Sequence, residues 1–120
     1  MLVKIDNMDI SKNIIAGSYD VNEHEISNVW TDGNGRKHKD FIRKQIQGTF
    51  ILKYNTQEEY EKFLRRCKNS KEDGLLPLTV HVNNTGEEKE IMAFCEFYPT
   101  IRKNCNGKVY DSFEFELEEQ

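Results

Sequence analysis

Histidine and cysteine are the side chains of this chain best suited to metal binding or nucleophilic catalysis. No two histidines are spaced i, i+4 on a predicted helix, and no histidine or cysteine pair has the spacing of zinc ligands. We therefore expect no metal site unless the fold gathers these residues, and we interpret the histidines as solvated surface groups. The residues concerned are His24, His38, His81, Cys67, Cys95 and Cys105.

The three cysteines differ in their sequence surroundings. Cys67 and Cys95 lie on predicted apolar faces, which is typical of small core side chains. Cys105 lies near Arg102, Lys103 and Lys108, and such cations lower the pKa of a thiol. A catalytic cysteine also needs a general base held beside it, and no motif supplies one. We interpret Cys105 as a loop thiol without a catalytic role.

The segment Asp32-Gly33-Asn34-Gly35 faintly resembles the start of a calcium-binding loop. Counted from Asp32 as position one, an EF-hand would need an oxygen ligand at position five and a bidentate glutamate at position twelve, where this chain has Arg36 and Arg43. We therefore predict a tight turn that uses glycine at positive φ. No glycine-rich phosphate-binding motif follows a strand. The expectation is a protein that is not an enzyme, with no cofactor and no small-molecule substrate.

Charge and hydropathy limit the partners. The chain has 21 acidic and 17 basic residues, for a net charge of −4. A basic cluster with Trp30 and Phe41 beside it is the combination that binds single-stranded nucleic acid, but the acidic surroundings favour a solvated loop or a contact with an acidic neighbouring subunit. No apolar run approaches the roughly 20 residues of a membrane span. We expect neither a nucleic-acid nor a membrane partner. The cluster is Arg36, Lys37, His38, Lys39, Arg43 and Lys44.

Hydrophobic periodicity predicts one domain over residues 1–120 with a single helix. Thr56 and Glu59 form a capping box, and an apolar stripe follows at helical spacing from Tyr60 to Cys67. Period-two alternation predicts strands over 14–21, 42–54, 76–82, 91–97 and 109–117. Gly48 indicates a bulge or a close backbone approach.

The polar segment between the first two of these strands predicts a long exposed loop, about 23–40, which is the kind of connection that carries function. The resulting fold class is α+β and mostly β: an antiparallel β-sandwich or partly closed barrel with one amphipathic helix packed on it.

The last predicted strand carries glutamates along one side, and two interpretations stay open. They could keep that face of the strand hydrated and prevent an edge strand from pairing with another chain and aggregating. They could also meet the basic loop of another copy, which would suit a ring of identical subunits. The residues are Glu114, Glu116, Glu118 and Glu119.

The order of motifs resembles small tail proteins of phages and prophages of Gram-positive bacteria, with the scaffold of tail-tube and distal-tail proteins. The motifs are Ile5-Asp6-Asn7-Met8-Asp9-Ile10, the polar segment 19–39, Arg43-Lys44-Gln45-Ile46-Gln47-Gly48-Thr49-Phe50-Ile51-Leu52, Thr56-Gln57-Glu58-Glu59, and Phe113-Glu114-Phe115-Glu116-Leu117-Glu118. The resemblance implies a structural subunit of the tail tube, distal tail or baseplate, located in the virion after assembly in the host cytoplasm. Its partners would be copies of itself in a ring and other phage tail proteins.

The resemblance also implies that the long loop supplies subunit contacts. A monomeric phage accessory module that binds a host protein is the alternative, and it would present an aromatic patch around Trp30 and Phe41. An enzyme ranks last. The expected contact residues are Trp30, Asp32, Asn34, Arg36, Lys37, His38 and Lys39.

Overall fold

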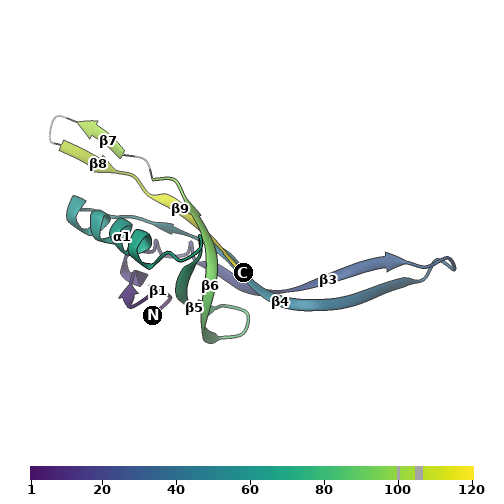
Figure 1. Cartoon of the computed structure of the whole chain (residues 1–120). Helices are drawn as coiled ribbons and strands as arrows, with labels where there is room; N and C mark the ends of the chain where they lie inside the picture. The colour runs from purple at the N-terminus through teal and green to yellow at the C-terminus, as the bar shows by residue number, and fades with distance from the viewer. Residues whose placement is uncertain (100, 105–106) are drawn as a thin grey trace.

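A computed structural model describes residues 1–99, 101–104 and 107–120 of the chain. Seven antiparallel strands form one sheet in the order β2-β1-β5-β6-β9-β4-β3, and a separate hairpin pairs β7 with β8 (Figure 1). The elements are β1 (Val3–Ile5), β2 (Met8–Asp9), a 3-10 turn (Ser11–Asn13), β3 (Asp20–Thr31), β4 (Lys37–Leu52), α1 (Gln57–Ser70), β5 (Leu76–Val82), β6 (Glu87–Phe97), β7 (Ile101–Asn104), β8 (Gly107–Tyr110) and β9 (Phe113–Glu119).

Helix α1 begins with one of the two hydrogen bonds of the predicted capping box. The hydroxyl of Thr56 accepts a hydrogen bond from the amide of Glu59 at 3.3 Å, which satisfies one of the amides left free at a helix start. Tyr60, Phe63 and Cys67 are buried on one side of the helix. That stripe lies against one face of the sheet, so the predicted amphipathic helix is confirmed.

The core lies between α1 and the concave face of the sheet. Phe50 of β4 stacks on Phe115 of β9 with ring centroids 4.9 Å apart, and Phe63 of α1 packs against Phe115 with a centroid distance of 6.3 Å. All three rings are fully buried. Aromatic clusters of this kind combine a large buried area with favourable ring geometry.

The sheet curls without closing. The main-chain amide of Asn83, just after β5, donates to the carbonyl of Val21 in β3 at 2.8 Å, although these strands lie at distant places in the sheet order. The mostly β, antiparallel α+β fold with one amphipathic helix packed on the sheet is confirmed, and the sheet stays open rather than forming a barrel.

Gly48 marks a close approach of two strands, as its position in an otherwise regular strand predicts. A Cβ atom at Gly48 would overlap the carbonyl oxygen of Asp20 and the Cα of Val21. Only glycine allows the paired strands β3 and β4 to approach this closely beside Val21.

Three expectations about the elements need correction. Residues 23–31 and 37–40 are paired strand rather than irregular loop, because β3 and β4 continue their hydrogen-bonded register to Thr31 and Lys37. The strand expected over 14–21 is present only from Asp20, where β3 begins, and a turn with Gly17 at φ +82° precedes it. The predicted strand 109–117 is broken between Tyr110 and Phe113.

The interpretation that the glutamates of the last strand protect a sheet edge is wrong. Strand β9 pairs with β4 on one side and with β6 on the other, so it is an interior strand and its glutamates do not lie at an edge.

In the described part of the chain, no helix is long and apolar enough to cross a membrane. Cys105 lies outside the described residues.

Candidate functional site

The most unusual feature of the molecule is a two-stranded projection, residues 24–44, which we call the arm. The molecule is 69 Å long and 28 Å in each other direction, and the arm accounts for the elongation in Figure 1. Strand β9 accompanies β4 only as far as Gln47. Beyond that point β3 and β4 pair only with each other.

A tight turn closes the tip of the arm. The carboxylate of Asp32 accepts hydrogen bonds from the amides of Asn34 and Arg36 at 2.9 and 3.0 Å. The amide of Asp32 donates to the carbonyl of Arg36, and Gly35 adopts φ +79°. The predicted turn with glycine at positive φ is therefore confirmed, and residues 32–36 are the only part of 23–40 that is not strand.

Trp30 and His38 face each other across the arm. Their rings stack with centroids 4.2 Å apart, and the indole Nε1 donates to the carboxylate of Asp40 at 3.1 Å. The imidazole Nε2 of His38 lies 2.8 Å from the carboxylate of Asp32. This hydrogen bond is the largest cause that lowers the pKa of Asp32. The indole Nε1 of Trp30 and the imidazole Nε2 of His38 thus both contact carboxylates of the arm itself.

The arm exposes four large apolar side chains. Val29 is 66%, Trp30 48%, Phe41 58% and Ile42 53% exposed. An isolated two-stranded hairpin is only marginally stable in water. Exposed aromatic and branched side chains on a projection of this kind are typical of a surface that another molecule covers.

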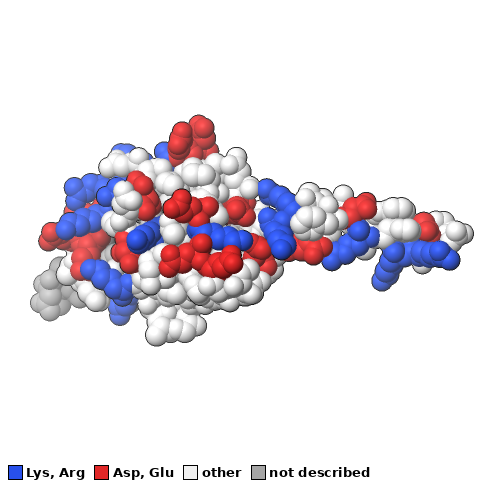
Figure 2. Space-filling model, turned by 90° about the horizontal axis from the view of Figure 1, so that it is seen from below, with Lys and Arg blue, Asp and Glu red and all other residues white. Residues whose placement is uncertain are grey.

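The basic residues predicted as a cluster do lie together along the arm. Figure 2 shows blue side chains following this projection. Residues 24–44 carry a net charge of +2 and the rest of the chain −6, which together give the total of −4. Lys39 pairs with Glu25 at 3.1 Å. Among the described side chains, Arg36 and Lys37 make no ion pair.

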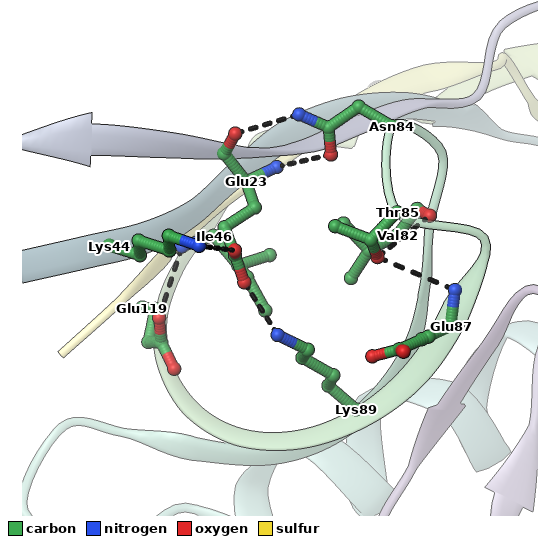
Figure 3. Close-up of polar contacts among 9 residues, drawn as sticks. All are labelled: Glu23, Lys44, Ile46, Val82, Asn84, Thr85, Glu87, Lys89 and Glu119. Atoms are coloured by element: carbon green, nitrogen blue, oxygen red, sulfur yellow. Dashed lines mark hydrogen bonds and ion pairs between the residues drawn. The ribbon is translucent and has the colours of Figure 1, made fainter.

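A set of polar contacts fixes the root of the arm (Figure 3). The side-chain amide of Asn84 bonds both main-chain groups of Glu23: its oxygen accepts from the amide at 2.9 Å, and its nitrogen donates to the carbonyl at 2.8 Å. Asn84 thus pairs with the outer edge of β3 as a neighbouring strand would. These two bonds hold β3 at the point where the arm leaves the sheet.

The carboxylate of Glu23 provides the second part of this anchor. Lys89 of β6 approaches it at 2.6 Å and Lys44 of β4 at 3.8 Å. The hydrogen bond from Lys89 is the main reason that the pKa of Glu23 lies below its usual value, and it raises the pKa of Lys89. Because Lys89 and Asn84 both come from the β5–β6 region, that region sets the direction of the arm.

The predicted contact residues all lie at the tip or along the outer half of the arm. Sequence reasoning missed the anchor residues Glu23, Asn84 and Lys89. The only signal was an Asn-Asn pair in a turn, which occurs in many unrelated turns. The residues expected to make subunit contacts therefore lie together on the outer arm, and Glu23, Asn84 and Lys89 hold the root of that arm. The predicted residues are Trp30, Asp32, Asn34, Arg36, Lys37, His38 and Lys39.

The other candidates for chemistry stay apart. The three histidines lie on different parts of the sheet: His24 at the start of the arm, His38 at its tip and His81 on β5. Over residues 1–99, 101–104 and 107–120, no group of three or more histidine, cysteine or acidic side chains could hold a metal ion. Cys67 and Cys95 line one cavity beside α1, and burial raises the pKa of each thiol to about 12.

Comparison with known proteins assigns the chain to no family. No family model matches it and no solved structure matches it. A Plasmodium falciparum protein named "Putative histone-lysine N-methyltransferase 1" is 31% identical over an alignment of 101 residues that covers 75% of this chain. The chain spans about 1% of the length of that protein, so the similarity carries no argument about methyl transfer. The resemblance to phage tail proteins stays a prediction.

Proposed function

We propose that this protein is a structural subunit of a bacteriophage or prophage tail, in the tail tube, distal tail or baseplate, and that it acts by protein–protein assembly through the arm. The observation that carries the proposal is the arm itself: two strands beyond the last neighbouring strand, with exposed Val29, Trp30, Phe41 and Ile42. The assignment to a tail rests on the order of sequence motifs. No catalytic role is part of the proposal.

The anchor at the root supports an assembly role. A contact that must form repeatedly between identical subunits loses less entropy when its geometry is set in advance. Asn84 and Lys89 hold the start of β3 in one orientation, and the stacked pair of Trp30 and His38 stiffens the tip. The arm is thus presented at a fixed angle to the rest of the sheet.

Solution mass measured by light scattering over a concentration series tests the proposal. The comparison is between the intact protein and a variant in which residues 29–39 are replaced by Asn-Gly. Asn28 and Asp40 are cross-strand partners, so a two-residue turn can close the shortened hairpin there. We expect the intact chain to form a concentration-dependent ring or tube, visible by electron microscopy, and the shortened chain to remain monomeric.

A point variant and a matched control sharpen the test. Trp30→Ser with Phe41→Ser removes the aromatic side chains of the arm, and Tyr98→Ser removes an aromatic that is 81% exposed elsewhere. Only the arm variant should lose assembly. A strict monomer at millimolar concentration would contradict the proposal and favour a monomeric module whose arm binds a host protein. An antibody to the chain should label the tails of the phage particles that encode it.

A further inference from the structure

The face of the sheet that lies away from α1 carries a shallow hollow of about 450 Å³. Two cross-strand rows of side chains line it. The strand register aligns Asp20, Thr49, Glu116 and Glu96 in one row, and Asn22, Gln47, Glu118 and Phe94 in the next. Four strands, β3, β4, β9 and β6, therefore build one surface, which we call the acidic hollow.

The charges in the acidic hollow are poorly compensated. Glu96 of β6 and Glu116 of β9 are directly opposite one another, and like charges in that position destabilise a sheet. Among the described side chains, no lysine or arginine forms an ion pair with either. Asp20 at the end of the same row is also exposed. A hollow lined by one sign of charge concentrates the field and attracts cations.

An exposed aromatic ring lies within the acidic hollow. Phe94 is 52% exposed and is the cross-strand partner of Glu118. The surface therefore offers carboxylates for a cation beside an apolar ring for an aromatic or aliphatic group. The arm presents that same combination with the opposite charge.

The tip of the arm supplies the complementary groups. Arg36 and Lys37 have no ion-pair partner among the described residues. Val29, the cross-strand partner of Lys39, shares one face of the arm with Lys37, and Trp30 lies on the other face opposite His38. The arm extends away from the sheet (Figure 1), and its paired strands and anchored root prevent it from folding back. Arm tip and acidic hollow can meet only between two molecules.

We propose that the acidic hollow is the acceptor site for the arm tip of a second copy of this chain. Arg36 and Lys37 of one copy lie against Glu96 and Glu116 of the next, and apolar arm residues cover Phe94. The contact joins two different surfaces, so it is head-to-tail, and repetition closes a ring or extends a tube. The inference rests on the proposed function, because it names the surface that the arm contacts.

Charge reversal with rescue tests the pairing. One variant carries Glu96→Lys and Glu116→Lys, a second carries Arg36→Glu and Lys37→Glu, and a third combines all four substitutions. We expect each double variant alone to self-associate at least 10-fold more weakly by light scattering. The combined variant, and an equimolar mixture of the two double variants, should recover assembly because opposite charges face each other again.

A neutralising variant separates binding from folding. Glu96→Gln with Glu116→Gln removes the repulsion within the acidic hollow, so its melting temperature should equal or exceed that of the parent chain. Its self-association should nevertheless weaken about 10-fold. A matched reversal at exposed glutamates outside the acidic hollow, Glu61→Lys with Glu72→Lys, should leave assembly unchanged.

Trp30 offers an independent readout because it is the single tryptophan of the chain. Its emission should shift to the blue on assembly of the parent chain and stay unshifted in the Glu96→Lys, Glu116→Lys variant. If shortening the arm abolishes assembly while reversal of the acidic hollow does not, the acceptor surface is wrong and the proposed function survives. If the parent chain shows neither assembly nor a Trp30 shift at any concentration, both proposals fail.

Discussion

Strands β3 and β4 run through two regions with opposite character. Within the sheet, Ile46, Phe50 and Leu52 of β4 share one face and are fully buried. On the arm, Ile42 has the same parity along β4 as Ile46 but is 53% exposed. The difference is the absence of neighbours: β9 and α1 cover the sheet portion, whereas the arm has only its own two strands. Strand pairing alone makes an extended shape, and burial on one face makes it stable.

The first prediction contrasts two phenylalanines of β4. Phe50→Ala should lower the free energy of unfolding by about 3–5 kcal/mol, because it leaves a cavity against Phe115 in the core. Phe41→Ala on the arm should change it by less than about 0.5 kcal/mol in the monomer. Denaturant titration of both variants at low protein concentration makes the measurement. Equal losses would mean that the arm is part of the cooperative core.

The second prediction concerns the close approach of β3 and β4 at Gly48. Gly48→Ala should cost about 1–3 kcal/mol, because the new methyl group overlaps the main chain of Asp20 and Val21. Gly33→Ala at the arm tip is the control, since a Cβ there meets nothing within 4 Å. Thermal unfolding of the two variants should place Gly48→Ala well below the parent chain and Gly33→Ala close to it.

The third prediction tests the anchor that joins the two regions. Asn84→Ala removes both hydrogen bonds to Glu23. It should lower the free energy of local opening of β3, as measured by amide hydrogen exchange, by about 1–2 kcal/mol. Asn84→Asp keeps the acceptor but loses the donor, so its effect should be intermediate. Hydrogen exchange followed along β3 measures the loss. Uniform loss over the whole sheet would assign Asn84 to general stability rather than to the root of the arm.

The fourth and smallest effect is a pH dependence at the same root. Lys89 lowers the pKa of Glu23 below its ordinary 4.5, so the contribution is complete above pH 4.5 and is lost as pH falls through the lower folded-state value. The raised pKa of Lys89 places the alkaline loss above 10.5. Protection against hydrogen exchange at residues 20–26 is measured at each pH in the parent chain and in Lys89→Met. At neutral pH the parent chain should be the better protected of the two. The difference should vanish in strong acid.

Local sequence determined the parts of the fold whose causes lie close together in the chain. The Thr56 cap and the stripe of Tyr60, Phe63 and Cys67 lie within one helix, so their spacing alone predicted α1. The turn at Asp32 depends on its own hydrogen bonds and on Gly35. The close approach at Gly48 was also predictable, because glycine inside a strand pattern has few other uses.

Only the tertiary structure decided what lies beside each strand. Residues 23–40 contain no alternating apolar face because neither face of the arm is buried, and a rule based on burial therefore predicted a loop. Strand β9 pairs on both sides, which its own alternation does not reveal. The Asn84–Glu23 contact spans 61 residues. The acidic hollow needs the register of four strands, because long-range pairing, and not local preference, places Glu96 opposite Glu116.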